Sequence, residues 1–162
     1  MNLVEQSIKL VIKTIWMVIS GIVKGLQIPE LLYCIRRKVK RLFGNKSKYS
    51  LRDFEVMTGK QFEHAVQEIL ETKDFRTRTL PWNDYGADLI AEKEGLRFVI
   101  QCKRYSNNVG LDAVQEAYTA CRYYGCDKAW VITNSEFTFQ AQKMAEKIGV
   151  RAMSGKELEK LI

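Results

Sequence analysis

The stretch DLIAEKEGLRFVIQCK, residues 88–103, decides the fold of this chain. Its first apolar run follows Asp88, residues 92–95 make a charged turn that ends in glycine, and a second apolar run with polar ends covers residues 97–103. Two short apolar runs around a glycine-containing turn are typical of a β-hairpin. Pairing the strands across the turn brings Asp88 close to the end of the second strand, so polar groups gather where the apolar run stops.

The polar side chains at this end of the hairpin are suited to holding a cation. Because side chains alternate along a strand, Gln101 and Lys103 share one face, while Cys102 points to the other face as a small hydrophobic residue. The Asp88 carboxylate can ligate Mg²⁺ directly and the Gln101 amide oxygen can take a further position, which leaves room for water and phosphate oxygens. Lys103 could orient or deprotonate an attacking water, or neutralise the negative charge of a phosphoryl transition state. The sequence leaves both roles of Lys103 open.

A helix before the hairpin offers a second acid. Apolar residues recur with helical spacing in residues 62–70, and Gly59 and Glu63 lie near the start of this segment. Glu63 is a candidate second metal ligand because it lies near the helix end that could face the hairpin. Two ordinary alternatives remain open. An acid in the first turn of a helix is favoured by the helix dipole, and Asp, Gln and Lys at this spacing also occur in exposed hairpins.

The chain after the hairpin alternates helices with short strands. The apolar pattern predicts helices over residues 111–124, 139–148 and 154–161 and strands over residues 129–133 and 150–153. This order predicts an α/β fold, with a mixed sheet flanked by helices and preceded by one or two N-terminal helices. Residues 44–50 have the composition of a linker, which divides the chain into an N-terminal segment, residues 1–43, and a domain, residues 51–162.

Several motifs together point to one family. They are GKQFE at residues 59–63, GADLIA at 86–91 and QCKRY at 101–105, with shorter matches at 109–110, 114–116, 133–134, 137–138, 140–141 and 149–150. In their order and spacing, these motifs resemble the catalytic domain of the Mrr-type (type IV) restriction endonucleases, within the PD-(D/E)XK nuclease superfamily. The resemblance begins at Gly59 and runs to the end of the chain.

The resemblance implies a restriction-endonuclease-like fold and a set of site residues. Asp88, Gln101 and Lys103 would be the catalytic trio, with Gln101 at a position where many relatives carry an acid, and Glu63 would match the acid of the first helix. The implied metal ligands are Asp88, Gln101 and Glu63, and the implied cofactor is Mg²⁺. The implied reaction is hydrolysis of DNA phosphodiester bonds, in restriction or defence.

Three further residues are candidate DNA contacts. Arg104 and Tyr105 follow Lys103 and could reach a phosphate, although an arginine at a strand end is often simply solvated. By the resemblance, Gln115 lies on a helix close behind the site. In the better-known relatives a separate N-terminal domain recognises modified, typically methylated, DNA, and residues 1–50 leave no room for such a domain. The preference for modified or plain DNA, or for RNA, stays open.

The N-terminal 50 residues carry the positive charge of the chain. They contain ten lysine and arginine residues against two acidic residues, a balance of +8 within a whole-chain charge of +7. The basic excess therefore does not belong to the C-terminal domain, and the overall charge is no argument that this domain binds DNA.

The N-terminal segment predicts an association with a membrane. Residues 8–26 are mostly apolar, and on a helical wheel their lysines fall on one stripe, which fits an amphipathic interfacial helix, or a helix in a membrane bundle, better than a lone spanning helix. A second predicted helix, residues 30–43, carries a basic cluster that would bind anionic headgroups and place the domain at the inner, cytoplasmic face. A solvated helix, a protein partner or a basic arm on DNA phosphates are the alternatives. The cysteines Cys34, Cys102, Cys121 and Cys126 show no zinc-ligand spacing and suit a reducing cytoplasm.

Three functions remain under consideration. The favoured one is a metal-dependent DNA endonuclease. The second is a catalytically inactive module that keeps the nuclease fold as a binding or scaffold unit at a membrane or on DNA. The third is a structure-selective nuclease that resembles the Holliday junction resolvases, and this function would require a homodimer.

Overall fold

The computed structural model describes residues 12–13, 15–16, 19, 49–81 and 85–162. The chain divides into two units, Met1–Gly44 and Asn45–Ile162. The five described residues of the first unit are helical, and the remaining predictions for residues 1–43, together with most of the predicted linker, lie outside the described residues. No helix within the described residues combines the length and apolarity needed to cross a membrane.

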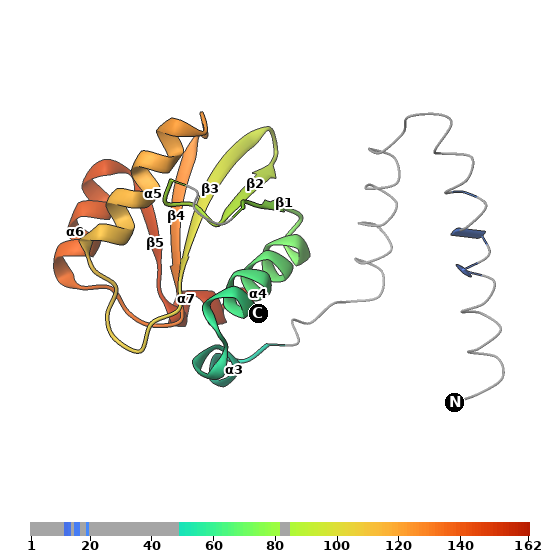
Figure 1. The fold of residues 1–162 in the computed structure, drawn as a ribbon, viewed down its shortest axis with the longest axis horizontal. Coiled ribbons are helices and arrows are strands. Elements are labelled where there is room, and N and C mark those ends of the chain that lie inside the picture. Colours follow the sequence, from blue (N-terminus) through green and yellow to red (C-terminus); the bar gives the residue numbers. More distant parts are fainter. Residues whose placement is uncertain (1–11, 14, 17–18, 20–48, 82–84) are drawn as a thin grey trace. The chain divides into compact units, whose positions relative to one another are not determined.

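A mixed five-stranded sheet forms the centre of the second unit, in the spatial order β1-β2-β3-β4-β5 (Figure 1). The strands are β1 (Arg76–Thr79), β2 (Leu89–Lys93), β3 (Leu96–Lys103), β4 (Lys128–Thr133) and β5 (Val150–Met153). β1, β2 and β3 pair antiparallel, whereas β3, β4 and β5 pair parallel. The predicted hairpin is β2–β3, and its turn residues Glu94 and Gly95 have φ angles of 53° and 79°, as the tight turns of hairpins require.

Helices cover both faces of this sheet (Figure 1). They are α3 (Leu51–Val56), α4 (Gly59–Thr72), α5 (Leu111–Tyr123), α6 (Phe139–Ile148) and α7 (Gly155–Glu159). One apolar cluster joins α5 and α6 to the face of the sheet that carries Ile90 and Val99. The other cluster joins α3, α4 and α7 to the opposite face, which carries Leu89 and Ile100.

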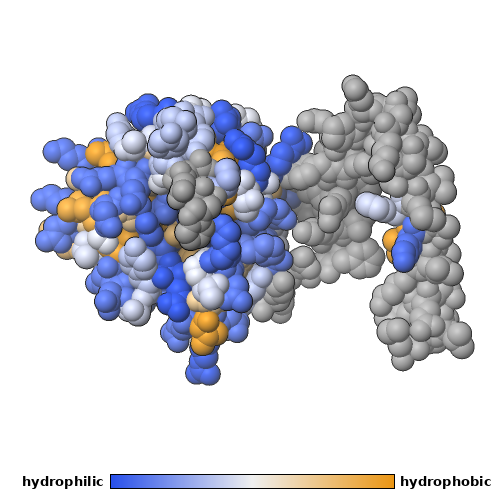
Figure 2. All heavy atoms as spheres, in the orientation of Figure 1, coloured by the Kyte–Doolittle hydropathy of each residue, from blue (hydrophilic) through white to orange (hydrophobic). Residues whose placement is uncertain are grey.

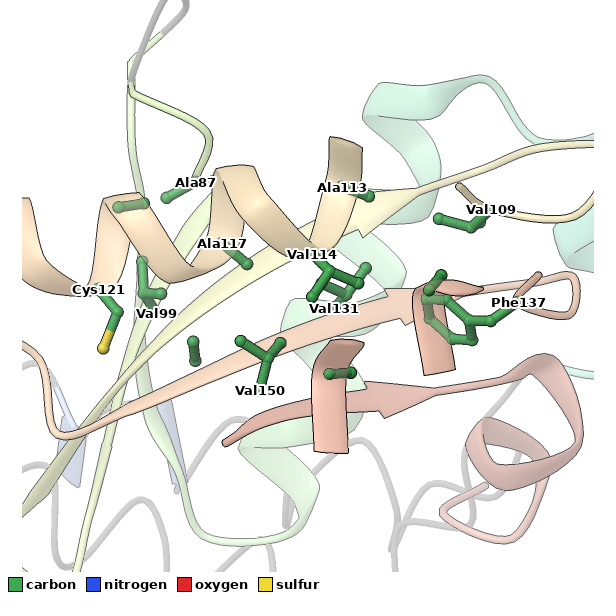
Figure 3. Close-up of a cluster of buried hydrophobic side chains, with 14 of the residues drawn as sticks. Ala87, Val99, Val109, Ala113, Val114, Ala117, Cys121, Val131, Phe137 and Val150 are labelled. Atoms are coloured by element: carbon green, nitrogen blue, oxygen red, sulfur yellow. The ribbon is translucent and has the colours of Figure 1, made fainter. Parts of the chain in front are cut away.

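The helix α5 lies close to the sheet because its buried face is made mainly of small residues. Ala113, Val114, Ala117 and Cys121 of α5 belong to one buried cluster with the sheet, in which Val114 lies beside Val131 and Cys121 beside Val99 (Figure 3). The opposite pattern holds outside, where the visible face of the described residues is mainly hydrophilic with separate apolar spots (Figure 2). The close approach of α5 matters for function, because this helix covers the face on which Gln101 and Lys103 lie.

The predicted α/β architecture, a mixed sheet flanked by helices, is confirmed. The sequence did not predict the helix α3 or the strand β1. The β1 strand reads Arg-Thr-Arg-Thr and is largely exposed, and it is held by antiparallel pairing with β2 at the edge of the sheet. The predicted orientation of Cys102 is also confirmed, since its side chain is buried in the cluster under α4.

Candidate active site

A pocket of about 390 Å³ opens where β2 begins and β3 ends. It collects residues from the start of α4, the loop before β2, the end of β3 and the middle of α5. Its lining residues are Lys60, Glu63, Leu80, Pro81, Gly86, Ala87, Asp88, Gln101, Lys103 and Glu116. The four residues that the sequence predicted as catalytic, Glu63, Asp88, Gln101 and Lys103, therefore share one pocket.

The backbone of β3 holds the Asp88 carboxylate in place. The Asp88 N–H donates to the Ile100 carbonyl at 2.9 Å, and the Cys102 N–H donates to Asp88 Oδ2 at 2.7 Å. Burial raises the pKa of Asp88 to about 6, and the Glu63 charge adds to the rise, while the hydrogen bond from Cys102 and the charge of Lys103 oppose it. The pocket thus contains a fixed carboxylate whose negative charge is poorly compensated by the protein.

Gln101 places a buried amide oxygen in the pocket. The residue is 7% exposed, and its Oε1 atom is buried without a hydrogen-bond partner among the described residues. A buried polar atom without a partner costs free energy. In a pocket that also contains the Asp88 carboxylate, this oxygen favours a site for a positively charged group from outside the chain.

Both lysines of the pocket are held by glutamates. Lys103 Nζ lies 2.7 Å from Glu116 Oε2, and Lys60 Nζ lies 2.9 Å from Glu63 Oε2. Burial lowers the pKa of Lys103, but the hydrogen bond and charge of Glu116 more than offset this effect, so the pKa is raised. The hydrogen bond to Glu63 likewise raises the pKa of Lys60. Both ammonium groups are therefore protonated at neutral pH.

The three predicted DNA contacts do not line the pocket. The Arg104 guanidinium donates to the carbonyl of Met57 at 2.6 Å and to that of Glu55 at 3.3 Å, so it ties the end of β3 to the connection between α3 and α4. Tyr105 is 41% exposed, and its N–H donates to Asn134 Oδ1 at 2.8 Å. Gln115 is exposed on α5. Their contact with DNA stays a prediction.

The sequence reasoning missed Lys60 and Glu116. Glu116 could have been found from helix periodicity, because it lies three residues after Ala113 and four before Ala120, both of which are buried. That spacing places Glu116, and not its neighbour Gln115, on the face of α5 turned toward the sheet. Lys60 could have been found because residues three apart on a helix are neighbours, which predicts an ion pair between Lys60 and the candidate ligand Glu63.

A sequence profile decides the family of this chain. The profile of a restriction endonuclease family, Mrr_cat, matches residues 54–162, which is more than half of the chain. The chain belongs to this restriction endonuclease family. The matched region contains the whole five-stranded sheet and helices α4 to α7, and the pocket of Asp88 and Gln101 lies inside it.

Curated and solved relatives match part of this chain. An uncharacterised protein of Archaeoglobus fulgidus is 28% identical over 96 residues, which cover 53% of this chain and 55% of the relative. The crystal structure of a protein of unknown function has a TM-score of 0.51 at 26% identity, over 57% of this chain and 55% of that one. A repair endonuclease from Pyrococcus abyssi has a TM-score of 0.45 at 20% identity, over 67% of this chain and 48% of that one. The chain thus spans about half the length of the relatives that it matches.

The residues of the family's pocket fit a divalent metal. Mg²⁺ is usually bound by one or two carboxylates together with waters and substrate phosphates, and Asp88, Glu63 and the orphaned Gln101 oxygen supply such a partial set. In the described part of the chain, no three His, Cys, Asp or Glu residues are arranged to hold a metal by themselves. A metal at this position would therefore depend on Gln101 and on water or phosphate oxygens to complete its coordination.

Proposed function

We propose that this protein is a divalent-metal-dependent endonuclease that hydrolyses phosphodiester bonds of DNA in a restriction or defence role. Asp88, Gln101 and Glu63 would hold Mg²⁺, and Lys103 would be the fourth catalytic residue. The observation that carries the proposal is the buried Gln101 Oε1, which has no partner among the described residues and belongs to the same pocket as the fixed Asp88 carboxylate. Membership of a restriction endonuclease family supplies the substrate class.

The residues of the pocket would have different roles in the reaction. Asp88 is aimed by the Cys102 N–H, and its pKa of about 6 leaves it ionised at neutral pH. Lys103 is protonated, and its side chain is only 16% exposed. Its positive charge would therefore lie close to an entering phosphate in a pocket that is partly shielded from water. Charges interact more strongly there than in bulk water. The bound Mg²⁺ would supply Lewis-acid stabilisation of the charge that develops on the phosphate. Two roles were considered for Lys103, proton abstraction and electrostatic stabilisation. Its raised pKa keeps the ammonium protonated, which favours electrostatic stabilisation.

Cleavage of plain and methylated duplex DNA with Mg²⁺ tests this proposal. We expect the wild-type protein to cut at least one of the two substrates, and Asp88→Ala and Lys103→Ala to lose the activity while remaining folded by circular dichroism. Lys156→Ala is the matched control, because Lys156 also forms an ion pair, with Glu136 at 3.1 Å, but outside the pocket. Cleavage that persists in both pocket variants would refute the assignment.

The same experiment separates the alternatives. Binding of DNA without cleavage, in the presence of Mg²⁺ or Mn²⁺, would support the catalytically inactive scaffold. Preference for a four-way junction, together with a dimer in sedimentation analysis, would support the resolvase-like nuclease. An RNA substrate included in parallel decides between the two nucleic acids.

The predictions for the N-terminal part remain proposals of their own. We propose a segment of residues 1–43 that associates with the inner face of a membrane, a linker at residues 44–50 and a nuclease domain at residues 51–162. Limited proteolysis should cut first within residues 44–50. Membrane fractionation followed by a high-salt wash tests the association, because screening releases a protein held by surface charge and leaves an inserted one.

A further inference from the structure

The Glu116 side chain forms an ion pair with Lys103, the lysine of the proposed catalytic site. Glu116 Oε2 lies 2.7 Å from Lys103 Nζ, and the lysine side chain is 16% exposed while the glutamate is 42% exposed. A lysine has a flexible stem of four carbons and three N–H donors. An acceptor on α5 that takes one of these donors fixes the ammonium and leaves two donors for water or phosphate.

The same residue also supports the loop that delivers Asp88. Gly86 has a φ angle of +80°, and a Cβ added there would lie 2.7 Å from Glu116 Cβ and 3.0 Å from its Cα and carbonyl oxygen. The loop before β2 therefore rests directly on the backbone of residue 116. Position 116 is thus in contact with the loop that carries Asp88 and, through its carboxylate, with Lys103.

Glu116 differs from Glu63, the other ion-paired glutamate of the pocket, in the lysine that it holds. Its carboxylate pairs with Lys103, the lysine at the end of β3, whose side chain is 16% exposed. On the other side of the pocket, Lys60 pairs with Glu63 in a similar way, but its side chain is 64% exposed. Of the two ion pairs, the Lys103–Glu116 pair is the one whose lysine is largely buried.

We propose that Glu116 is a positioning residue, which acts through Lys103 by holding its ammonium over the pocket between Asp88 and the entering phosphate. This inference deepens the proposed function and rests on it. A charge that is displaced by about 1 Å can cost about 100-fold in rate even when substrate binding is intact. Loss of Glu116 should therefore lower kcat more than it weakens DNA binding.

The test compares Glu116→Ala and Glu116→Gln with Glu136→Ala in the full-length protein. Glu136 also pairs with a lysine, at 3.1 Å, but Lys156 is 80% exposed and the pair lies outside the pocket. The first readout is the NMR signal of the Lys103 side-chain ¹⁵Nζ and ¹³Cε nuclei, assigned with Lys103→Arg. We expect an ordered signal in the wild type and in Glu136→Ala, and a mobile one in Glu116→Ala.

The second readout is the kinetics of DNA cleavage with Mg²⁺ and the affinity for DNA with Ca²⁺. We expect Glu116→Ala to lower kcat by at least about tenfold, with DNA affinity changed by less than about twofold. Glu116→Gln keeps an acceptor at the same place and should recover part of kcat. If Glu116→Ala does not fold, the Gln variant carries the test: its neutral, weaker acceptor should leave the Lys103 signal more mobile than in the wild type and lower kcat by a smaller factor.

Two results would overturn the inference. One is a Lys103 signal as ordered in the folded Glu116 variant as in the wild type, and the other is an unchanged kcat in a folded variant with a mobile Lys103. A fall of kcat that follows a fall in the folded fraction would also count against it. A wild-type protein that cleaves no DNA would refute the proposed function, whereas the NMR comparison would still decide whether Glu116 restrains Lys103.

Discussion

Replacement of Asp88 by asparagine should make the metal-free protein more stable at neutral pH. The Asp88 pKa rises from 3.8 to about 6 because the carboxylate is buried and lies near Glu63. A shift of about two units corresponds to about 3 kcal/mol, which is the free energy that the ionised group costs in the folded protein. Asparagine removes this charge, and its side-chain oxygen can still accept the hydrogen bond from the Cys102 N–H.

The sign of the pH dependence follows from the direction of the shift. Between about pH 4 and pH 6 the folded state binds more protons than the unfolded state, so the free energy of unfolding of the wild type falls as the pH rises through this window. The difference between Asp88→Asn and the wild type should therefore be absent below about pH 4 and fully present above about pH 6 to 7. Added Mg²⁺ should reduce this difference, because a ligand that binds only the folded wild type stabilises it.

Urea unfolding of the metal-free proteins at a series of pH values measures this difference. Asp127→Asn is a matched control, because Asp127 Oδ2 also accepts a backbone N–H, from Arg97 at 2.7 Å, but Asp127 is exposed. The control should show no comparable gain in stability. If Asp88→Asn is equal to or less stable than the wild type near about pH 7.5, the carboxylate is not held in an unfavourable charged state and the argument for a cation site weakens.

Three further substitutions test other contacts. Gln101→Leu removes a buried oxygen without a partner, so the free energy of unfolding should not fall, while Mg²⁺ binding measured by calorimetry should be lost. Gly86→Ala should lower the stability by about 1–3 kcal/mol in thermal unfolding, because the residue has a positive φ and its new Cβ would meet α5; Gly59→Ala, where nothing lies within 4 Å, should not. Arg104→Lys should cost about 1–2 kcal/mol, since it loses donors to two backbone carbonyls. An Arg104 variant of unchanged stability with a weaker salt dependence of DNA binding would instead indicate a phosphate contact.

The hairpin and the elements after it could be predicted because the order of apolar and polar residues in them matches the order of buried and exposed positions. β3 is a mostly apolar run that is buried on both faces, and the two-residue period of a strand assigns each of its residues to a face. The apolar runs of β4 and β5 are bounded by helices with clear periodicity. The strand β1 gave no such signal, because its residues are arginine and threonine and its stability comes from backbone pairing with β2. The short helix α3 did carry a readable sign, the capping box of Ser50 and Asp53.

The grouping of site residues was predictable only where one strand or hairpin brings them together. The two-residue period of β3 put Gln101 and Lys103 on one face, and the pairing of β2 with β3 brought Asp88 beside them. The contact of Lys103 with Glu116 depends on how α5 crosses the sheet after a loop, which is a tertiary feature with no local pattern between the two residues. The role of Arg104 could not be predicted for the same reason, because it donates to the carbonyls of Met57 and Glu55, almost fifty positions earlier in the chain.

The hydrogen bond that orients the Asp88 carboxylate comes from the backbone N–H of residue 102 and not from a side chain. Every residue type except proline can therefore provide this hydrogen bond at position 102. The thiol of Cys102 is buried on the other side of the sheet, so substitutions of Cys102 alter hydrophobic packing but keep the backbone hydrogen bond to Asp88. Alanine scanning would therefore overlook the group that orients the acid, whereas replacing this one amide by an ester through chemical ligation would expose its contribution.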